Sequence, residues 1–329
     1  MDTQQQGTVA VVGTGLIGQG WAIVFARAGL TVRLWDGDAQ ALARAVELIA
    51  AQLRALAAHG LLRDVPAIVG RLQACPTLEA ALADVEYVQE SLPERVELKR
   101  EFYQRLDALA PSAAILASST SSIPASAFTQ DLPGRGRCVI AHPVNPPYLV
   151  PVVEICGAPW TEPEVVQRAA AWMERVGQAP VIVRRELEGF VLNRLQGALL
   201  REAFRLYEQG YVDAEGLDRT IRDGLGLRWS FMGPFETIDL NAPDGLADYC
   251  ARYGGMYTSI AREQADSDPW PPALVARLHA ERRAALPAGQ LAERRIWRDE
   301  RLMRLAALKQ AFAADDAGDG KAGDRDKAP

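Results

Sequence analysis

The chain has 329 residues, of which 49% are hydrophobic and 24% charged, as in a soluble globular protein long enough for two domains. Its formal net charge of −6 at pH 7 argues against a nucleic-acid partner. No run approaches the roughly 18 apolar residues that span a bilayer, and no secretory signal pattern begins the chain. The four cysteines lack CxxC spacing, which disfavours a metal site or disulfide framework and favours a reducing cytoplasm.

The first half of the sequence alternates between strand and helix patterns. Residues 8–36 show a strand, a glycine turn, a helix and a second strand. The alternation continues with a helix over about 39–59, a strand at 85–91, a helix at 97–109, and strands at 114–119, 138–142, 150–155 and 179–184. It predicts an α/β fold of the Rossmann type, with a doubly wound parallel sheet and helices on both faces.

The pattern changes near residue 187, after which only helical spacing is found. Helices are expected over 188–210 and at about 213–223, 244–263, 271–285 and 289–312. The last residues are rich in Gly, Asp and Lys and poor in apolar side chains. We therefore predict three parts: a nucleotide-binding domain (1–187), an all-helical domain for substrate binding and dimerisation (188–312), and a disordered tail (313–329).

A glycine motif, Gly13-x-Gly15-x-x-Gly18, follows the first strand and opens the first helix. Gly13 allows a tight turn, Gly15 allows the pyrophosphate to approach the backbone, and Gly18 allows the helix to pack on the sheet. Asp36 ends the next strand, where a carboxylate accepts hydrogen bonds from both ribose hydroxyls and repels a 2′-phosphate. A glycine turn without a ligand would not need all these features together. The motif predicts NAD rather than NADP, held by these residues and by Leu16 and Ile17 at the helix start.

One histidine and one glutamate stand out in "AHPVNPPYLVPVVEI", residues 141–155. His142 ends one predicted strand, and Glu154 lies in the apolar run of the next. A buried carboxylate needs a partner, and an imidazole can accept a proton near neutral pH. The two side chains would form a catalytic pair if the strands are neighbours. The alternatives are a structural histidine beside proline and a glutamate paired with a surface arginine.

Several motifs together resemble the 3-hydroxyacyl-CoA dehydrogenase family. They are "GTGLIG" (13–18), "SSTSS" (118–122), "HPVNPP" (142–147), "PVVEI" (151–155), "GFVLNRL" (189–195) and "MGPFETID" (232–239), and they follow the family's order and spacing. "AHPVNPPY", "GFVLNRLQ" and "ERRIWRDERLMRLAALK" (293–309) are most similar to its lambda-crystallin branch, whose working members are L-gulonate 3-dehydrogenases. The resemblance implies the two-domain fold predicted above, the cofactor NAD and a homodimer.

The resemblance also implies roles for single residues. His142 would be the base that takes the proton of the substrate's 3-hydroxyl, and Glu154 its partner. Ser121 would hydrogen-bond the reacting oxygen, and Asn193 would lie over the reacting centre and hold the substrate. Intact catalytic residues argue against a purely structural, crystallin-like protein that binds NAD without turnover.

Three further residues are implied as cofactor contacts. Glu94 and Lys99 would lie beside the nicotinamide half, and Ser119 would contact the cofactor at a position where the acyl-CoA enzymes usually have asparagine. From the residues alone, other interpretations stay open. Glu94 and Lys99 fit a solvated helix face, Ser121 fits a turn cap, and Asn193 fits a polar position at a domain joint.

The chain departs from the acyl-CoA enzymes in two places. The Ala-rich segment 41–64 contains no lysine, whereas those enzymes carry a Lys-rich segment that contacts the CoA phosphates. Arg228, just before "MGPFE", could bind a free carboxylate, or it could pair with Glu236 or Asp239. Both departures favour a small free L-3-hydroxy acid, such as L-gulonate, as substrate. The alternatives are a short-chain 3-hydroxyacyl-CoA, such as 3-hydroxybutyryl-CoA, and L-carnitine.

Overall fold

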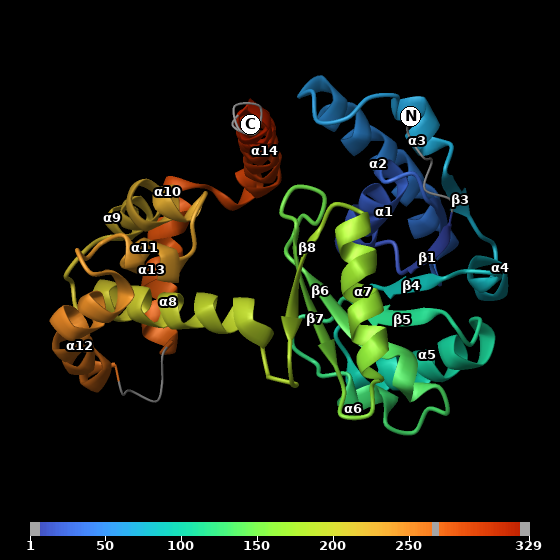
Figure 1. Ribbon diagram of the computed structural model, residues 1–329, viewed down its shortest axis with the longest axis horizontal. Helices are drawn as coiled ribbons and strands as arrows, with labels where there is room; N and C mark the ends of the chain where they lie inside the picture. The colour runs from blue at the N-terminus through green and yellow to red at the C-terminus, as the bar shows by residue number, and fades with distance from the viewer. Residues whose placement is uncertain (1–6, 265–269, 323–329) are drawn as a thin grey trace, which may run out of the picture. The chain divides into compact units, whose positions relative to one another are not determined.

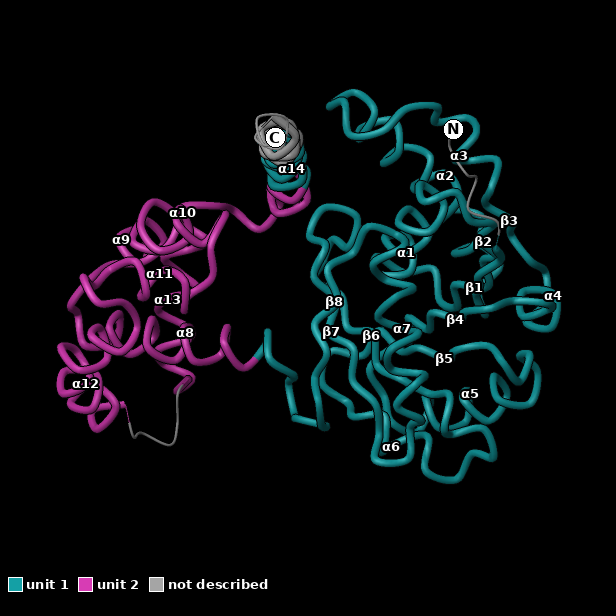
Figure 2. The backbone as a smooth tube through the Cα atoms, viewed as in Figure 1, with its two compact units in different colours: residues 1–193, 296–329 teal, residues 194–295 magenta. Residues whose placement is uncertain are grey.

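The computed structural model describes residues 7–264 and 270–322 and divides into two compact units. Unit 1 comprises Met1–Asn193 together with Ile296–Pro329, and unit 2 comprises Arg194–Arg295 (Figure 2). Over the described ranges, no helix is long and apolar enough to cross a membrane.

Unit 1 is built on an eight-stranded sheet with the order β3-β2-β1-β4-β5-β6-β7-β8 (Figure 1). All neighbouring strands are parallel except β6 and β7, which are antiparallel. The strands are β1 (Thr8–Val12), β2 (Thr31–Trp35), β3 (Leu72–Ala74), β4 (Tyr87–Glu90), β5 (Ile115–Ser118), β6 (Cys138–Pro143), β7 (Val152–Gly157) and β8 (Ala179–Val183). The predicted strands are confirmed. The three-residue edge strand β3 was not predicted, because it is too short to show a period.

Helices cover both faces of this sheet, which confirms the predicted doubly wound architecture. The helices of the sheet domain are α1 (Leu16–Arg27), α2 (Ala39–Ala58), α3 (Val65–Val69), α4 (Leu78–Leu82), α5 (Val96–Leu109), α6 (Ser126–Thr129) and α7 (Pro163–Arg175). Two hydrophobic clusters lie on the two faces: α1, α2, α3 and α7 contribute to one, and α4, α5 and α6 to the other.

The strand β1 shows why its sequence forms a central strand. Val9 and Val11 belong to one cluster, Ala10 and Val12 to the other, and all four are fully buried. A strand covered on both faces is apolar at every position, because successive side chains point to opposite sides. Burying each valine side chain stabilises the fold by about 1.5 to 3 kcal/mol. This burial fixes the positions of β1 and its neighbouring strands. The candidate site lies at the ends of these strands.

The rest of the chain is helical over the described residues. The helices are α8 (Phe190–Glu208), α9 (Ala214–Arg219), α10 (Gly226–Trp229), α11 (Pro234–Asp239), α12 (Gly245–Glu263), α13 (Pro272–Ala285) and α14 (Leu291–Ala322), with a π-helical segment at Thr220–Leu225. The absence of strands after β8 among these residues agrees with the sequence prediction.

The division into units differs from the predicted ranges 1–187 and 188–312. The first turn of α8, up to Asn193, belongs to unit 1, and so does α14 from Ile296. Met303 explains the second difference, because its side chain is buried in a hydrophobic cluster of the sheet domain. Helical spacing shows that α14 has an apolar side but not which domain receives it.

The disordered tail stays a prediction. Residues 313–322 continue α14, and residues 323–329 lie outside the described residues. Extending an existing helix is easier than nucleating one, and four of these ten residues are alanine, the best helix former.

Candidate active site

The glycine motif forms a tight loop between β1 and α1. Gly13 has a φ of +87°, which favours glycine, and a Cβ atom there would lie 2.7 Å from the backbone oxygen of Ser91. A Cβ atom on Gly18 would lie 1.9 Å from the backbone oxygen of Gly13. At Gly15, by contrast, a Cβ atom would meet nothing within 4 Å. The loop is therefore closed against the sheet at Gly13 and Gly18 and open at Gly15, where the sequence predicts the pyrophosphate.

The first turn of α1 offers amide donors at this open side. Its N-cap residue Gly15 provides no side-chain cap, and the side chain of Leu16 is 69% exposed. Uncapped N–H groups at a helix N-terminus attract anions through their hydrogen bonds and the helix dipole. We therefore expect the backbone amides of Leu16, Ile17 and Gly18 to bind the phosphates of the dinucleotide.

Asp36 follows β2 and lies against the same loop. Its Oδ2 atom accepts hydrogen bonds from the N–H of Thr14 (2.7 Å) and from Thr14 Oγ1 (2.9 Å), and its Oδ1 accepts one from the N–H of Asp38 (3.0 Å). A carboxylate has about four acceptor positions, so this geometry leaves one, on Oδ1. The hydrogen bonds of Asp36 to the ribose hydroxyls stay a prediction.

We expect Asp36→Ala to lower the affinity for NAD by about 10- to 100-fold, the effect of losing a hydrogen bond to a charged group. The ratio of kcat/KM with NADP to that with NAD should rise, because the carboxylate that repels a 2′-phosphate is gone. Thr14→Val is the matched control, since it removes the hydroxyl contact to Asp36 and keeps the carboxylate, so the NAD preference should persist. A wild-type enzyme that uses NADP as well as NAD would contradict this role for Asp36.

His142 and Glu154 face each other across the antiparallel strands β6 and β7. His142 Nδ1 lies 2.8 Å from Glu154 Oε2, and both side chains are buried, with 4% and 2% of their surfaces exposed. The predicted meeting of the two side chains is thus confirmed as geometry. Phe190 lies beside the imidazole, with the ring centroids 5.4 Å apart.

Glu154 is held in its charged form by three donors. Burial raises the pKa of its carboxyl, but hydrogen bonds from His142 and from the backbone N–H groups of Leu192 and Val191 outweigh burial and lower it. The two amides donate to Oε1 at 3.0 and 2.8 Å. An ionised carboxylate only accepts, so Nδ1 of His142 carries a proton and donates it. Nε2, the other ring nitrogen, has no hydrogen-bond partner among the described residues.

The first turn of α8 links this pair to the predicted substrate residues. Val191 and Leu192 bond Glu154, and the next residue, Asn193, donates from Nδ2 to the backbone oxygen of Ser121 at 2.9 Å. The sequence indicated Asn193 but not the two backbone amides, because backbone donors carry no residue signature. The structure therefore joins His142, Glu154, Asn193 and Ser121 through one short segment.

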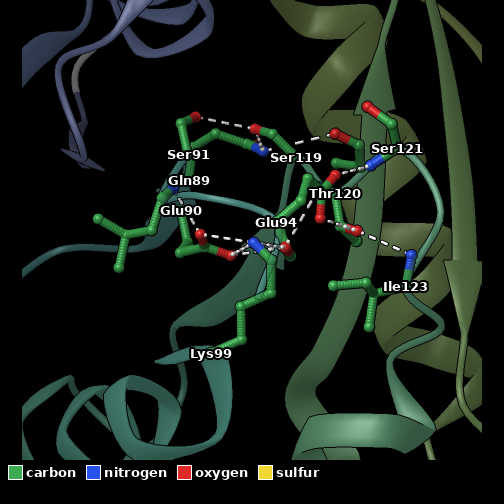
Figure 3. Close-up of polar contacts among 12 residues, drawn as sticks. Gln89, Glu90, Ser91, Glu94, Lys99, Ser119, Thr120, Ser121 and Ile123 are labelled. Atoms are coloured by element: carbon green, nitrogen blue, oxygen red, sulfur yellow. Dashed lines mark hydrogen bonds and ion pairs between the residues drawn. The ribbon is translucent and has the colours of Figure 1, made fainter. Parts of the chain in front are cut away.

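Glu94 shapes the loop that carries Ser121. Its Oε2 accepts a hydrogen bond from Thr120 Oγ1 at 2.7 Å, and its Oε1 accepts one from the N–H of Ser121 (Figure 3). Thr120 Oγ1 in turn accepts one from the N–H of Ile123 at 2.9 Å. The Ser121 side chain itself is exposed. The contacts of Glu94 in the structure are to this loop, and its place beside the cofactor stays a prediction.

Lys99 does not lie on a solvated helix face. Only 1% of its surface is exposed, and its Nζ atom lies 2.8 and 2.9 Å from the two carboxylate oxygens of Glu90, which is fully buried (Figure 3). Ser118 Oγ also donates to Glu90, at 2.6 Å. A buried charge needs a counter-charge, and Lys99 supplies it to Glu90 at the end of β4. Lys99 is therefore a buried counter-charge for Glu90, and its contact with the cofactor stays a prediction.

Ser119 is also buried, and its hydroxyl is surrounded by protein. It accepts from Gln89 Nε2 at 2.7 Å and from Trp21 Nε1 at 3.1 Å, and it lies 2.9 Å from Ser91 Oγ. The sequence did not single out Gln89, Trp21 or Ser91. Only their positions in the sequence could have indicated them, because they lie at the end of β4 and in α1, the elements that surround the glycine loop.

Arg228 lies in unit 2, at the third position of α10 (Gly226–Trp229), and its side chain is exposed. Neither Glu236 nor Asp239 forms an ion pair with it, so the alternative salt bridge is not found among the described residues. Asp239 instead accepts a hydrogen bond from the N–H of Leu246, at 2.7 Å. The role of Arg228 toward a substrate stays a prediction.

A doubly wound sheet with an open glycine loop and an aspartate after β2 defines an NAD-binding protein. Residues 8–187 match the family model of the 3-hydroxyacyl-CoA dehydrogenase NAD binding domain, and residues 189–286 match that of its C-terminal domain. Fold, site and matches together define an NAD-dependent dehydrogenase that acts on a CH–OH group. The chain belongs to the 3-hydroxyacyl-CoA dehydrogenase family.

Individual relatives agree with this assignment. The lambda-crystallin homolog of Bos taurus is 42% identical over 92% of this chain and 96% of its own. L-carnitine dehydrogenase of Streptomyces griseus is 42% identical over 76% of this chain and 75% of its own. Among solved structures, an NAD+-dependent dismutase, the 5-dehydrogenase of a formyl-hydroxy-methylpyridine carboxylic acid, superposes with a TM-score of 0.80, at 26% identity over 94% of this chain and 99% of that one.

Proposed function

We propose that the protein oxidises a small, free L-3-hydroxy acid, of the L-gulonate kind, to the 3-oxo acid. The observation that carries this proposal is the buried pair of His142 and Glu154, which leaves Nε2 of His142 without a partner among the described residues. When bound, NAD supplies the acceptor for the hydride that leaves C3. The proton of the 3-hydroxyl goes to Nε2 of His142, so that the C–H and O–H bonds break and a C=O bond forms.

Glu154, Asn193 and Ser121 have supporting roles in this proposal. Glu154 orients the imidazole and stabilises the positive charge that it acquires, as a buried carboxylate does for a general base. Asn193, in the first turn of α8, donates a hydrogen bond to the backbone oxygen of Ser121 in the loop after β5. We assign both residues to holding the substrate hydroxyl. Holding the reacting groups within a narrow range of geometry lowers the barrier by removing their translational freedom beforehand.

Two features support a free acid over a CoA thioester. Helix α2 and its flanks contain no lysine over residues 41–64 and only three arginines, Arg44, Arg54 and Arg63, so a site for the CoA phosphates is weaker than the Lys-rich segment of the acyl-CoA enzymes. L-carnitine, the substrate named for one relative, carries a free carboxylate, and the dismutase is named for a carboxylic acid. A 3-hydroxyacyl-CoA such as 3-hydroxybutyryl-CoA remains the main alternative.

L-carnitine is a second candidate because of one feature of unit 2. Tyr249, Tyr253 and Tyr257 follow each other on α12, with ring centroids 4.7 Å apart for Tyr249 and Tyr253 and 6.4 Å apart for Tyr249 and Tyr257. Aromatic faces bind quaternary ammonium groups. This arrangement favours carnitine if these rings line the substrate site.

The experiment is a panel of free acids with NAD, in which NADH formation is followed by absorbance. It contains L-gulonate, L-3-hydroxybutyrate and L-carnitine, each with its D enantiomer as the matched control. We expect turnover of at least one L acid and of no D acid. Turnover of none of them would contradict the proposal. Turnover of L-carnitine alone would replace L-gulonate by the second candidate.

We also propose that the protein is a homodimer. Val191, Leu195 and Leu199 follow each other at four-residue spacing on α8, and each is more than a third exposed, Leu195 by 63%. An apolar stripe of this kind is typical of an interface. Light scattering at micromolar concentration should report a dimer, and Leu195→Arg should shift it toward the monomer. A wild-type monomer under these conditions would contradict this proposal.

The cytoplasm is the compartment that we propose, from the cysteines. All four are free thiols. Burial raises the pKa of Cys138 and Cys156 to about 12, so these two thiols stay protonated and unreactive.

A further inference from the structure

A chain of buried hydrogen bonds lies behind the glycine loop and ends at Ser91. It begins at Tyr87, whose hydroxyl donates to Gln89 Oε1 at 3.2 Å. Gln89 Nε2 then donates to Ser119 Oγ at 2.7 Å and to the backbone oxygen of Ala141 at 3.4 Å. Because the oxygen of Ala141 only accepts, the amide group of Gln89 must point its nitrogen this way.

The direction of the last hydrogen bond follows from counting donors. Ser119 Oγ has two acceptor positions and one proton. Gln89 Nε2 and Trp21 Nε1 both donate to it, and an indole N–H cannot accept. Both acceptor positions are therefore filled, and the proton of Ser119 goes to Ser91 Oγ, 2.9 Å away. Ser91 is thus an acceptor toward Ser119, and its own proton points elsewhere.

That proton has no acceptor among the described residues, and Ser91 is only half-buried. Ser91 lies beside the glycine loop, where a bound cofactor would contact it. Its N–H bonds the backbone oxygen of Val12 at the end of β1, and its own backbone oxygen is the atom that a Cβ on Gly13 would strike. Figure 3 shows Ser91 beside Ser119 at the ends of their strands.

The sheet order then indicates which part of NAD is near. The strand order reverses between β1 and β4, and a dinucleotide binds across such a reversal. Asp36, after β2, marks the adenosine side, and His142, on β6, marks the side of the chemistry. Ser91 follows β4 and therefore lies on the nicotinamide side, directly beside the phosphate loop.

We propose that the Ser91 hydroxyl is a cofactor-binding group that donates a hydrogen bond to the ribose of the nicotinamide half of NAD. The buried chain from Tyr87 to Ser119 fixes this hydroxyl as a donor. Ser119, which the resemblance implied as a cofactor contact, acts behind it as a positioning residue.

The experiment compares the binding of three ligands to Ser91→Ala and to the wild type by calorimetry, without substrate or turnover. ADP lacks the second ribose, ADP-ribose contains it, and NAD contains it with nicotinamide. Loss of one neutral hydrogen bond should weaken ADP-ribose and NAD by about three- to tenfold and leave ADP within about twofold. Ser112→Ala, at an exposed serine before β5, is the control and should change none of the three.

Two further variants distinguish loss of the hydroxyl from a general fold defect, which thermal melting would reveal. Ser91→Cys keeps the shape but offers only a weak S–H donor, so the same selective loss is expected. Ser91→Thr keeps the hydroxyl and should bind all three ligands nearly as the wild type does. Unchanged ADP-ribose binding in Ser91→Ala and Ser91→Cys would overturn the proposal, as would an equal loss for ADP.

Discussion

His142→Ala should lower kcat by a factor on the order of 10² to 10⁴, the usual effect of losing a general base. The physical reason is that Nε2 of His142 is the proton acceptor of the proposed reaction, and the hydrogen bond between Nδ1 and Glu154 orients the ring and stabilises the charge it acquires. NAD affinity should hardly change, because the imidazole is on β6, away from the glycine loop after β1. Steady-state kinetics and calorimetric NAD binding would measure the two quantities separately.

His59→Ala is the matched control for this variant. His59 ends α2, and its Nδ1 atom lies 3.0 Å from the backbone oxygen of Ala55, so it has a local structural contact and no place in the proposed site. Its removal should leave kcat within about twofold of the wild type, well below the effect of losing a general base. A His142→Ala enzyme that keeps more than about half of the wild-type kcat would remove His142 from the mechanism.

Arg228→Met should lower kcat/KM for free hydroxy acids by about 30- to 1000-fold, which corresponds to a charge-assisted contact of about 2 to 4 kcal/mol. A free carboxylate is planar and charged, and guanidinium offers it two parallel donors, whereas a thioester carbonyl needs no cation. The prediction rests on an exposed arginine that has no ion pair with Glu236 or Asp239. NAD binding should be unchanged.

Arg228→Lys separates charge from geometry. An ammonium keeps the charge but cannot make the paired contact, so kcat/KM should recover only in part. Arg222→Met is a control on the same stretch of helix, because Arg222 already pairs with the neighbouring Asp223 at 3.0 Å and should not matter for the acid. Unchanged kcat/KM in Arg228→Met would exclude Arg228 from carboxylate binding.

The sequence predicted those features that depend on local pattern or on strand neighbours. Val9 to Val12 indicated a buried strand, and the glycine motif after it predicted the loop. The spacing of His142 and Glu154 suggested a contact, because two short strands joined by a compact loop pair side by side, and β6 and β7 do so.

Other features depend on contacts that no local pattern marks. Lys99 fits a solvated position on an amphipathic helix, and only the buried Glu90 at the end of β4 explains why its ammonium group turns inward. The partners of Ser119 are a second example, because Trp21 and Gln89 come from elements distant in sequence and enclose its hydroxyl. The position of α14 likewise depends on Met303, whose burial belongs to the tertiary structure.

The proposed preference for a free acid is tested most directly by a matched pair of substrates. L-3-hydroxybutyrate and L-3-hydroxybutyryl-CoA share the reacting carbon and differ only at C1, so the ratio of their kcat/KM values, measured with NAD and the wild-type protein, isolates the choice between carboxylate and thioester. We predict a higher kcat/KM for the free acid, and a loss of that advantage in Arg228→Met. A wild-type enzyme that strongly prefers the CoA thioester to every free acid tested would contradict the proposed function.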